Sequence, residues 1–259
     1  MLPSTIVAGS HLPTRVRNEL DWPLPIARGA RQMRAKRVQE WLTIAGFSLN
    51  IDSDFGAATE QRVKDFQSNR GLPATGQVDA RTHEQLVDPL VKAIAPINAG
   101  NRTLADLILS YAVQHVAQHP VEAGGDNCGP WVRAYMGQDG PDWRWCSGFV
   151  CFALEQAART LGVRQPIPSS ASCDTMSANA RNAGLYHREG TVRPSQILPG
   201  SFFLVRRTNN DWTHIGVVSD AGADTMRTVE GNTDSGGSDN GFEASERVRN
   251  YAKKDFIIW

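Results

Sequence analysis

A cysteine, a histidine and two later polar residues have the types and order that nucleophilic acyl transfer requires. Cys146 lies at the start of an expected helix over about residues 147 to 161, where the helix dipole and unpaired backbone N–H groups favour a thiolate. A thiolate nucleophile needs a base, and His214, at the head of an expected strand, is the candidate. The imidazole in turn needs an acceptor that orients it.

Glu230 and Asn232 are the candidates for that acceptor. They lie two positions apart on the next expected strand, and the two-residue period of a strand places both side chains on one face. Either residue could therefore contact His214. The pattern predicts a thiolate–imidazolium pair between Cys146 and His214 across an open groove, with backbone N–H groups at the helix start binding the oxyanion.

Two tryptophans flank these residues. Trp145 directly precedes Cys146, and Trp212 lies two positions before His214. Core packing is the usual role of a tryptophan, but each of these two is a candidate for stacking on sugars or peptides beside the cleft.

The other three cysteines are not assigned a chemical role. Their spacing matches neither a zinc site nor a disulfide framework. Cys151 is expected in the core, because five positions along a helix turn it about 140° away from Cys146. A bridge between Cys128 and Cys173 is not expected in a protein made in the cytoplasm. The histidines also form no zinc pattern, so neither a metal nor another cofactor is expected.

Residues 30 to 90 predict three short helices. Apolar residues at helical spacing end at Gly46, a second helix ends at Gly71, and Asp79 can cap a third. These residues resemble a known family, the three-helix peptidoglycan-binding domain. The resemblance covers Val38-Gln39, Asp52-x-Asp54-Phe55-Gly56, Thr59, Val63-x-x-Phe66-Gln67, Gly71-Leu72 and Thr75-Gly76-x-Val78-Asp79. It implies bacterial peptidoglycan as the partner.

The remainder of the chain predicts an α+β domain. Thr103 and Asp106 have the spacing of a capping box at a helix start. Beyond Pro199 and Gly200 the pattern changes to short apolar strands. Helices followed by strands favour an antiparallel sheet. The strands are expected at 201–205, 215–219, 226–232 and 256–259.

Several segments of this second region resemble the CHAP family of cysteine, histidine-dependent amidohydrolases/peptidases, which is papain-like. They are Gly129-Pro130-Trp131-Val132, Trp145-Cys146-Ser147-Gly148-Phe149-Val150, Gly200-Ser201-Phe202-Phe203, His214-Ile215-Gly216-Val217-Val218 and Glu230-Gly231-Asn232-Thr233. The resemblance implies that Cys146 is the nucleophile, His214 the base and Glu230 the orienting group. Asn232 would be an accessory polar contact.

Four parts of the chain follow from these patterns. They are an irregular arm (1–29), the binding domain (30–90), a linker (91–101) and the catalytic domain (102–259). A formal net charge of zero argues against nucleic acid as the partner. No apolar run approaches the roughly 18 residues of a membrane helix, so membrane insertion is not expected.

The expected activity is hydrolysis of an amide bond in the peptidoglycan peptide. The sequence leaves open whether the enzyme is an N-acetylmuramoyl-L-alanine amidase or an endopeptidase. The first residues lack the pattern of a signal peptide. We therefore expect synthesis in the cytoplasm and action in the periplasm or on the wall after release through a holin or a secretion machine. Phage endolysin and injected antibacterial effector both fit, and a non-catalytic wall-binding protein is the main rival. Action on an amide in another protein is a further alternative.

Overall fold

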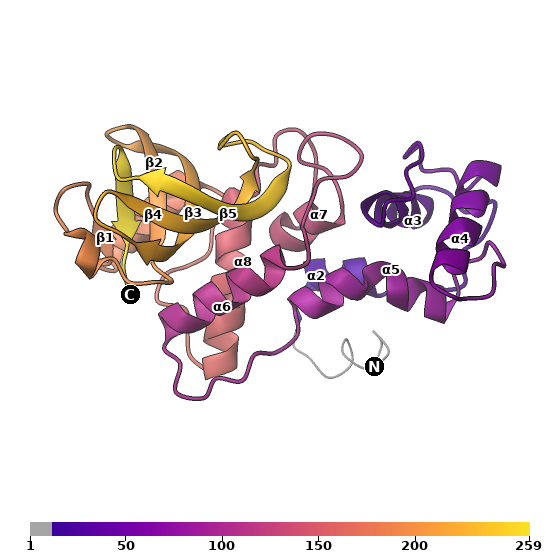
Figure 1. Ribbon diagram of the computed structural model, residues 1–259, viewed down its shortest axis with the longest axis horizontal. Helices are drawn as coiled ribbons and strands as arrows, with labels where there is room; N and C mark the ends of the chain where they lie inside the picture. Colours follow the sequence, from indigo (N-terminus) through magenta and orange to yellow (C-terminus); the bar gives the residue numbers. More distant parts are fainter. Residues whose placement is uncertain (1–11) are drawn as a thin grey trace. The chain divides into compact units, whose positions relative to one another are not determined.

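The computed structural model describes residues 12–259, which divide into two compact units (Figure 1). The first unit comprises the described residues up to 91 together with 121–143, and the second comprises 92–120 and 144–259. The first holds α2 (Thr14–Leu20), α3 (Met33–Ile44), α4 (Ala57–Asn69), most of α5 (Ala80–Ala93) and α7 (Pro130–Met136). The second holds α6 (Leu104–Val116), α8 (Cys146–Leu161), α9 (Cys173–Asn182), a 3-10 helix η1 (Pro194–Gln196) and six strands.

The three predicted helices of the first unit are confirmed as α3, α4 and α5. Gly46 and Gly71 follow α3 and α4 in the left-handed conformation, with φ of 89° and 67°, which glycine adopts without a steric penalty. Asp79 accepts a hydrogen bond from the backbone N–H of Thr82 at 2.8 Å and so caps α5.

Two buried glutamines hold the loops between these helices. The Gln39 side-chain amide donates to Asp52 Oδ1 at 2.7 Å and to Thr59 Oγ1 at 3.1 Å, and its oxygen accepts from the Ser53 N–H at 2.9 Å. Gln39 is 1% exposed. Its hydrogen bonds replace those to water that burial removes. They fix the turn between α3 and α4.

Gln67 has the same role one helix later. Its amide donates to the Gln77 carbonyl at 2.8 Å and to Thr82 Oγ1 at 2.9 Å, while its oxygen accepts from the Gly76 N–H at 2.9 Å. The polar residues of the sequence motif are therefore structural in part. They tie each loop to the helix that precedes it.

Two expectations about the organisation of the chain need correction. The arm was expected to be irregular over residues 1–29, but α2 occupies Thr14–Leu20; residues 1–11 lie outside the described part. The region 102–259 was expected to form one domain, but 121–143 belongs to the first compact unit. The predicted linker 91–101 is therefore not the only place where the chain passes from one unit to the other.

A buried ion cluster explains why 121–143 joins the first unit. Arg133, on α7, donates from Nε and Nη2 to Glu19 at 2.9 Å and from Nη1 and Nη2 to Glu40 at 3.0 and 2.6 Å. Asp139 also accepts from Nη1 at 2.6 Å. The two glutamates are 1% and 0% exposed, and buried carboxylates require such a partner.

The second unit contains one antiparallel sheet in the order β1-β6-β2-β3-β4-β5. The predicted α+β class and antiparallel sheet are confirmed, whereas the papain-like assignment stays a prediction. The bounds are β1 (Tyr186–His187), β2 (Phe202–Thr208), β3 (Asp211–Ala221), β4 (Thr225–Thr233), β5 (Glu243–Asn250) and β6 (Lys254–Ile257). Four of the strands were predicted, and β1 and β5 were not.

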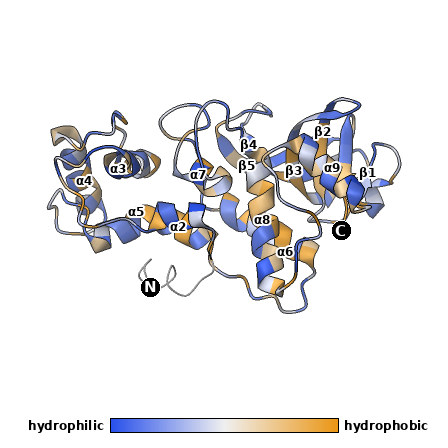
Figure 2. Ribbon diagram, turned by 180° about the vertical axis from the view of Figure 1, so that it is seen from behind, coloured by the Kyte–Doolittle hydropathy of each residue, from blue (hydrophilic) through white to orange (hydrophobic). Residues whose placement is uncertain are grey.

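Helices α6 and α8 lie side by side and pack against β3 and β4 (Figure 2). The predicted capping box is present: the Asp106 N–H donates to Thr103 Oγ1, and Asp106 Oδ2 accepts from the Thr103 N–H at 2.8 Å. The first residue of α8 therefore lies near the two strands that carry the other candidate residues. No helix within residues 12–259 is long and apolar enough to cross a membrane.

Replacing Gln39 with leucine tests the role of the first glutamine. We expect Gln39→Leu to lower the free energy of unfolding of the first unit by about 1–3 kcal/mol, because Asp52, Ser53 and Thr59 lose their buried partner. Gln61→Leu is the matched control, since Gln61 is exposed and bonds Asp65 one turn along the same helix. Urea unfolding measures both variants. Equal losses for the two would contradict a structural role for Gln39.

Candidate active site

Cys146 is the first residue of α8. The preceding residue, Trp145, is hydrogen-bonded to β4. The Trp145 N–H donates to Asn232 Oδ1 at 3.1 Å, and Asn232 Nδ2 donates to the Gly241 carbonyl at 2.6 Å. Asn232 has a positive φ of 57° and lies at a register shift between β4 and β5. Asn232 thus holds the start of α8 against β4, which is more specific than the accessory contact expected for it.

His214 lies on β3 and bonds Glu230 on the neighbouring β4. Its Nε2 is 2.8 Å from Glu230 Oε2, and both side chains are fully buried. Within the described residues Nδ1 has no hydrogen-bond partner, while the imidazole interacts electrostatically with the Cys146 sulfur. The sequence left Glu230 and Asn232 as possible acceptors for His214. In the structure Glu230 is the residue that hydrogen-bonds the imidazole.

Two glycines allow the close approach that this arrangement needs. A Cβ at Gly216 would lie 2.5 Å from Phe203 Cε1 and 2.9 Å from Glu230 Cγ. A Cβ at Gly231 would lie 2.6 Å from Phe149 Cβ, on α8. A larger residue at position 216 would push β3 away from β4, and a larger residue at position 231 would push β4 away from α8. Gly216 therefore leaves room for the Glu230 side chain beside β3, and Gly231 allows β4 to lie close to α8.

Arg249, on β5, is a residue of the site that the sequence did not indicate. Its Nε donates to Glu230 Oε1 at 2.9 Å and its Nη2 to Oε2 at 2.6 Å, which is a bidentate pair. Thr228 Oγ1 donates to Oε1 at 2.5 Å. Burial opposes the charge of Glu230, but the bonds from Arg249 and His214 prevail and lower its pKa to about 2.

The charge on Glu230 has a direct effect on His214. Burial disfavours the imidazolium form, but the polar interactions with Cys146 and Glu230 outweigh it and raise the pKa of His214 to about 10. The pKa of the Cys146 thiol is held well below its ordinary value by Cys173, by His214 and by the Ile215 backbone, against the effect of burial. Both shifts favour a thiolate and an imidazolium at neutral pH.

Cys173 is the second residue that the sequence analysis left without a role. It is the first residue of α9, and its Sγ lies 3.9 Å from the Cys146 Sγ. The interaction with Cys146 and burial raise the pKa of the Cys173 thiol well above its ordinary value. The raised pKa favours a protonated thiol at Cys173, in contact with the Cys146 sulfur.

The expected open groove is not present at the sulfur. Cys146 is 3% exposed, Trp145 is fully buried and Trp212 is 6% exposed. The Trp212 indole N–H donates to Asp255 Oδ2 at 2.8 Å. The expectation that Trp145 and Trp212 stack on substrate receives no support, because both rings are taken up by packing against the protein.

The chain has two further cysteines, Cys151 and Cys128. Cys151 is buried, as predicted, and its Sγ is 3.5 Å from the Ser170 carbonyl. Cys128 and Cys173 are both free and belong to different compact units. In residues 12–259 no group of three or more histidine, cysteine, aspartate or glutamate side chains could hold a metal ion.

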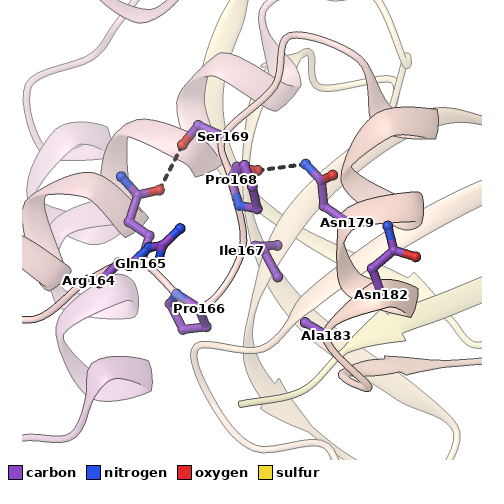
Figure 3. Close-up of a pocket in the computed structure, with 9 residues that line it drawn as sticks. All are labelled: Arg164, Gln165, Pro166, Ile167, Pro168, Ser169, Asn179, Asn182 and Ala183. Carbon is purple, nitrogen blue, oxygen red and sulfur yellow. Dashed lines mark hydrogen bonds between the residues drawn. The ribbon is translucent and has the colours of Figure 1, made fainter.

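A pocket of about 730 Å³ lies beside α9 in the second unit (Figure 3). It is formed by the connection between α8 and α9 and by one face of α9; Asn179 Nδ2 donates to the Pro168 carbonyl at 2.9 Å across it. Its lining residues are Arg164, Gln165, Pro166, Ile167, Pro168, Ser169, Asn179, Asn182 and Ala183. None of the four predicted catalytic residues lines this pocket.

Comparison with known proteins identifies part of the first unit. Residues 33–86 match the family model described as a putative peptidoglycan binding domain. The match spans α3, α4 and the first half of α5, and it supports peptidoglycan as the partner and an interaction with the cell wall. No curated protein shows a significant match to the chain.

Replacing Glu230 with glutamine tests the electrostatics of the site. The folded pKa of His214, about 10, lies above its ordinary 6.5. Its protonated form therefore stabilises the fold fully below pH 6.5, and this contribution is lost as the pH rises through about 10. We expect Glu230→Gln to lower the His214 pKa, because it removes the adjacent negative charge, and to make the protein less stable between these two pH values.

NMR titration of the His214 ring measures this pKa directly. Glu246→Gln is the matched control, because Glu246 is an exposed glutamate on the edge strand β5. The control should leave the His214 titration where it is. A His214 that titrates near 6.5 in the unmodified protein would contradict the thiolate–imidazolium pair.

Proposed function

We propose that the protein is a peptidoglycan hydrolase that cleaves an amide bond of the wall peptide, with Cys146 as the nucleophile. One observation carries this proposal: Cys146, His214 and Glu230 come together from α8, β3 and β4 in a chain that also carries a peptidoglycan-binding family match. A nucleophile, a base and an orienting group in contact are the minimum for covalent acyl transfer.

The first half-reaction forms a thioester. The Cys146 thiolate attacks the amide carbonyl carbon, and the backbone N–H groups in the first turn of α8 bind the oxyanion. The His214 imidazolium then gives its proton to the leaving amine as the C–N bond breaks. Because Nε2 is bonded to Glu230, Nδ1 is the nitrogen that transfers this proton.

The second half-reaction restores the enzyme. The neutral imidazole takes a proton from water, the hydroxide attacks the thioester carbonyl, and the sulfur leaves as a thiolate paired again with the imidazolium. Glu230 keeps the ring oriented through both steps, and Arg249 keeps Glu230 ionised. Side chains that cover Cys146 must move before a substrate carbonyl can reach its sulfur, because only 3% of the residue is exposed.

The family match at residues 33–86 indicates which substrate the second unit would meet. Residues 33–86 would keep the protein on the insoluble wall, which raises the local concentration of wall peptides around the second unit. An enzyme acting on an amide of another protein would gain nothing from such a unit. The wall peptide is therefore the substrate class that the whole chain fits best.

Cys146→Ser provides the test of this function. We expect the variant to lose sacculus hydrolysis by on the order of a thousandfold or more, because a serine hydroxyl is not ionised at neutral pH. It should still pellet with sacculi through residues 33–86. Cys128→Ser is the control, since Cys128 is a free cysteine in the first unit.

The measurement is mass spectrometry of the fragments released from purified sacculi. A new amino terminus on the first alanine of the peptide identifies an amidase, and a new terminus within or between the peptides identifies an endopeptidase. Hydrolysis at an undiminished rate by Cys146→Ser would overturn the proposed nucleophile. Sacculus binding without any release of fragments by the unmodified protein would favour a non-catalytic wall-binding protein.

A further inference from the structure

Two reduced cysteines face each other at the starts of two helices in the second unit. Cys146 begins α8 and Cys173 begins α9, and their Sγ atoms are 3.9 Å apart. They are 3% and 8% exposed. Cys173 lowers the pKa of the Cys146 thiol, but no step of the proposed hydrolysis uses the Cys173 sulfur as a reactant.

The geometry of the pair suits a disulfide. At 3.9 Å the two sulfurs are in van der Waals contact, and bonding at about 2.05 Å requires them to approach by roughly 1.9 Å. Rotation of the two side chains supplies part of such a movement. The third cysteine nearby is held differently: Cys151 Sγ lies 3.5 Å from both the Ser170 carbonyl and Met176 Sδ.

The charges of the pair suit the reaction as well. Disulfide formation needs one thiolate that reacts with an oxidant and one thiol that resolves the product. The low pKa of Cys146 makes it the thiolate, and the raised pKa of Cys173 keeps it a thiol. Because the sulfurs touch, the resolving thiol is in place before any oxidant arrives.

We propose that Cys146 and Cys173 form a reversible redox pair, in which a hydroperoxide converts the reduced cysteines to a disulfide that blocks the nucleophile. The Cys146 thiolate attacks the peroxide oxygen, which breaks the O–O bond and gives a sulfenic acid and an alcohol or water after protonation. The Cys173 sulfur then attacks the sulfenic sulfur, and its proton leaves with the hydroxyl as water. A dithiol reductant returns both cysteines to thiols.

The pair would also protect the nucleophile. A sulfenic acid with no thiol nearby is oxidised further to sulfinic and sulfonic acids, which do not return. Cys173 intercepts the sulfenic acid and keeps the oxidation reversible. The effect on hydrolysis rests on the proposed function, whereas formation of the disulfide does not.

The experiment is a disulfide map of the folded full chain after treatment with hydrogen peroxide. Free thiols are blocked with N-ethylmaleimide, the chain is digested, and the peptides are identified by mass spectrometry before and after dithiothreitol. We expect one major linked pair, containing Cys146 and Cys173, that dithiothreitol separates. Cys128→Ser and Cys151→Ser should both retain this linked pair.

Cys173→Ser and Cys173→Ala test the resolving role. In both variants the peptide of Cys146 should carry sulfinic or sulfonic acid after peroxide, and dithiothreitol should not restore the thiol. Circular dichroism shows whether each Cys173 variant has folded. If neither has folded, the disulfide map of Cys151→Ser tests the proposal. A major pair that contains Cys128 or Cys151, or reduced Cys146 and Cys173 after peroxide, would overturn the proposal.

Sacculus hydrolysis provides the second measurement. Peroxide should abolish it in the unmodified protein and dithiothreitol should restore it, whereas the loss in Cys173→Ser should be permanent. If the reduced protein never hydrolyses sacculi, the proposed function fails, and the disulfide map still decides the redox pair.

Discussion

The site depends on one buried negative charge, the carboxylate of Glu230. A carboxylate with no exposed surface would ordinarily take up a proton, but Arg249, Thr228 and His214 all donate to it. The interactions with Cys146 and with this charge both raise the pKa of the His214 imidazole, and the imidazolium form in turn favours a thiolate at Cys146. The ionisation of the sulfur is therefore favoured by Cys173 and, through His214, by Glu230 on β4 and Arg249 on β5.

The sheet and the helix must be close for this relay of charges to work. Gly216 and Gly231 remove the side chains that would separate β3, β4 and α8. Asn232 on β4 accepts a hydrogen bond from the backbone N–H of Trp145, the residue before Cys146. Three consecutive residues of β4 thus have three different roles. Glu230 carries the buried negative charge, Gly231 allows close packing against α8, and Asn232 hydrogen-bonds the residue before α8.

The sequence predicted the elements with strong periodicity and the residues with distinctive chemistry. The helices at 33–44, 57–69 and 146–161 followed from it, and Glu230 and Asn232 followed as the two candidate partners of His214. Arg249 did not, because β5 alternates several charged residues and nothing local distinguishes one arginine from another. Cys173 was missed because the contact with Cys146 spans 27 residues, and chain spacing carries no signal for such a contact. The burial of Trp145 and Trp212 depends on packing that no motif encodes.

The chain passes between the two units more than once, which affects how truncated fragments of the protein can be designed. Residues 121–143 are encoded after the predicted linker but fold with the helices before it. A fragment that starts at residue 102 would keep Arg133 and lose Glu19 and Glu40, and a fragment that stops at residue 101 would keep the two acids and lose the arginine. Either truncation removes the bidentate pairs between Arg133 and the two glutamates, so a single cut in the predicted linker divides the first compact unit.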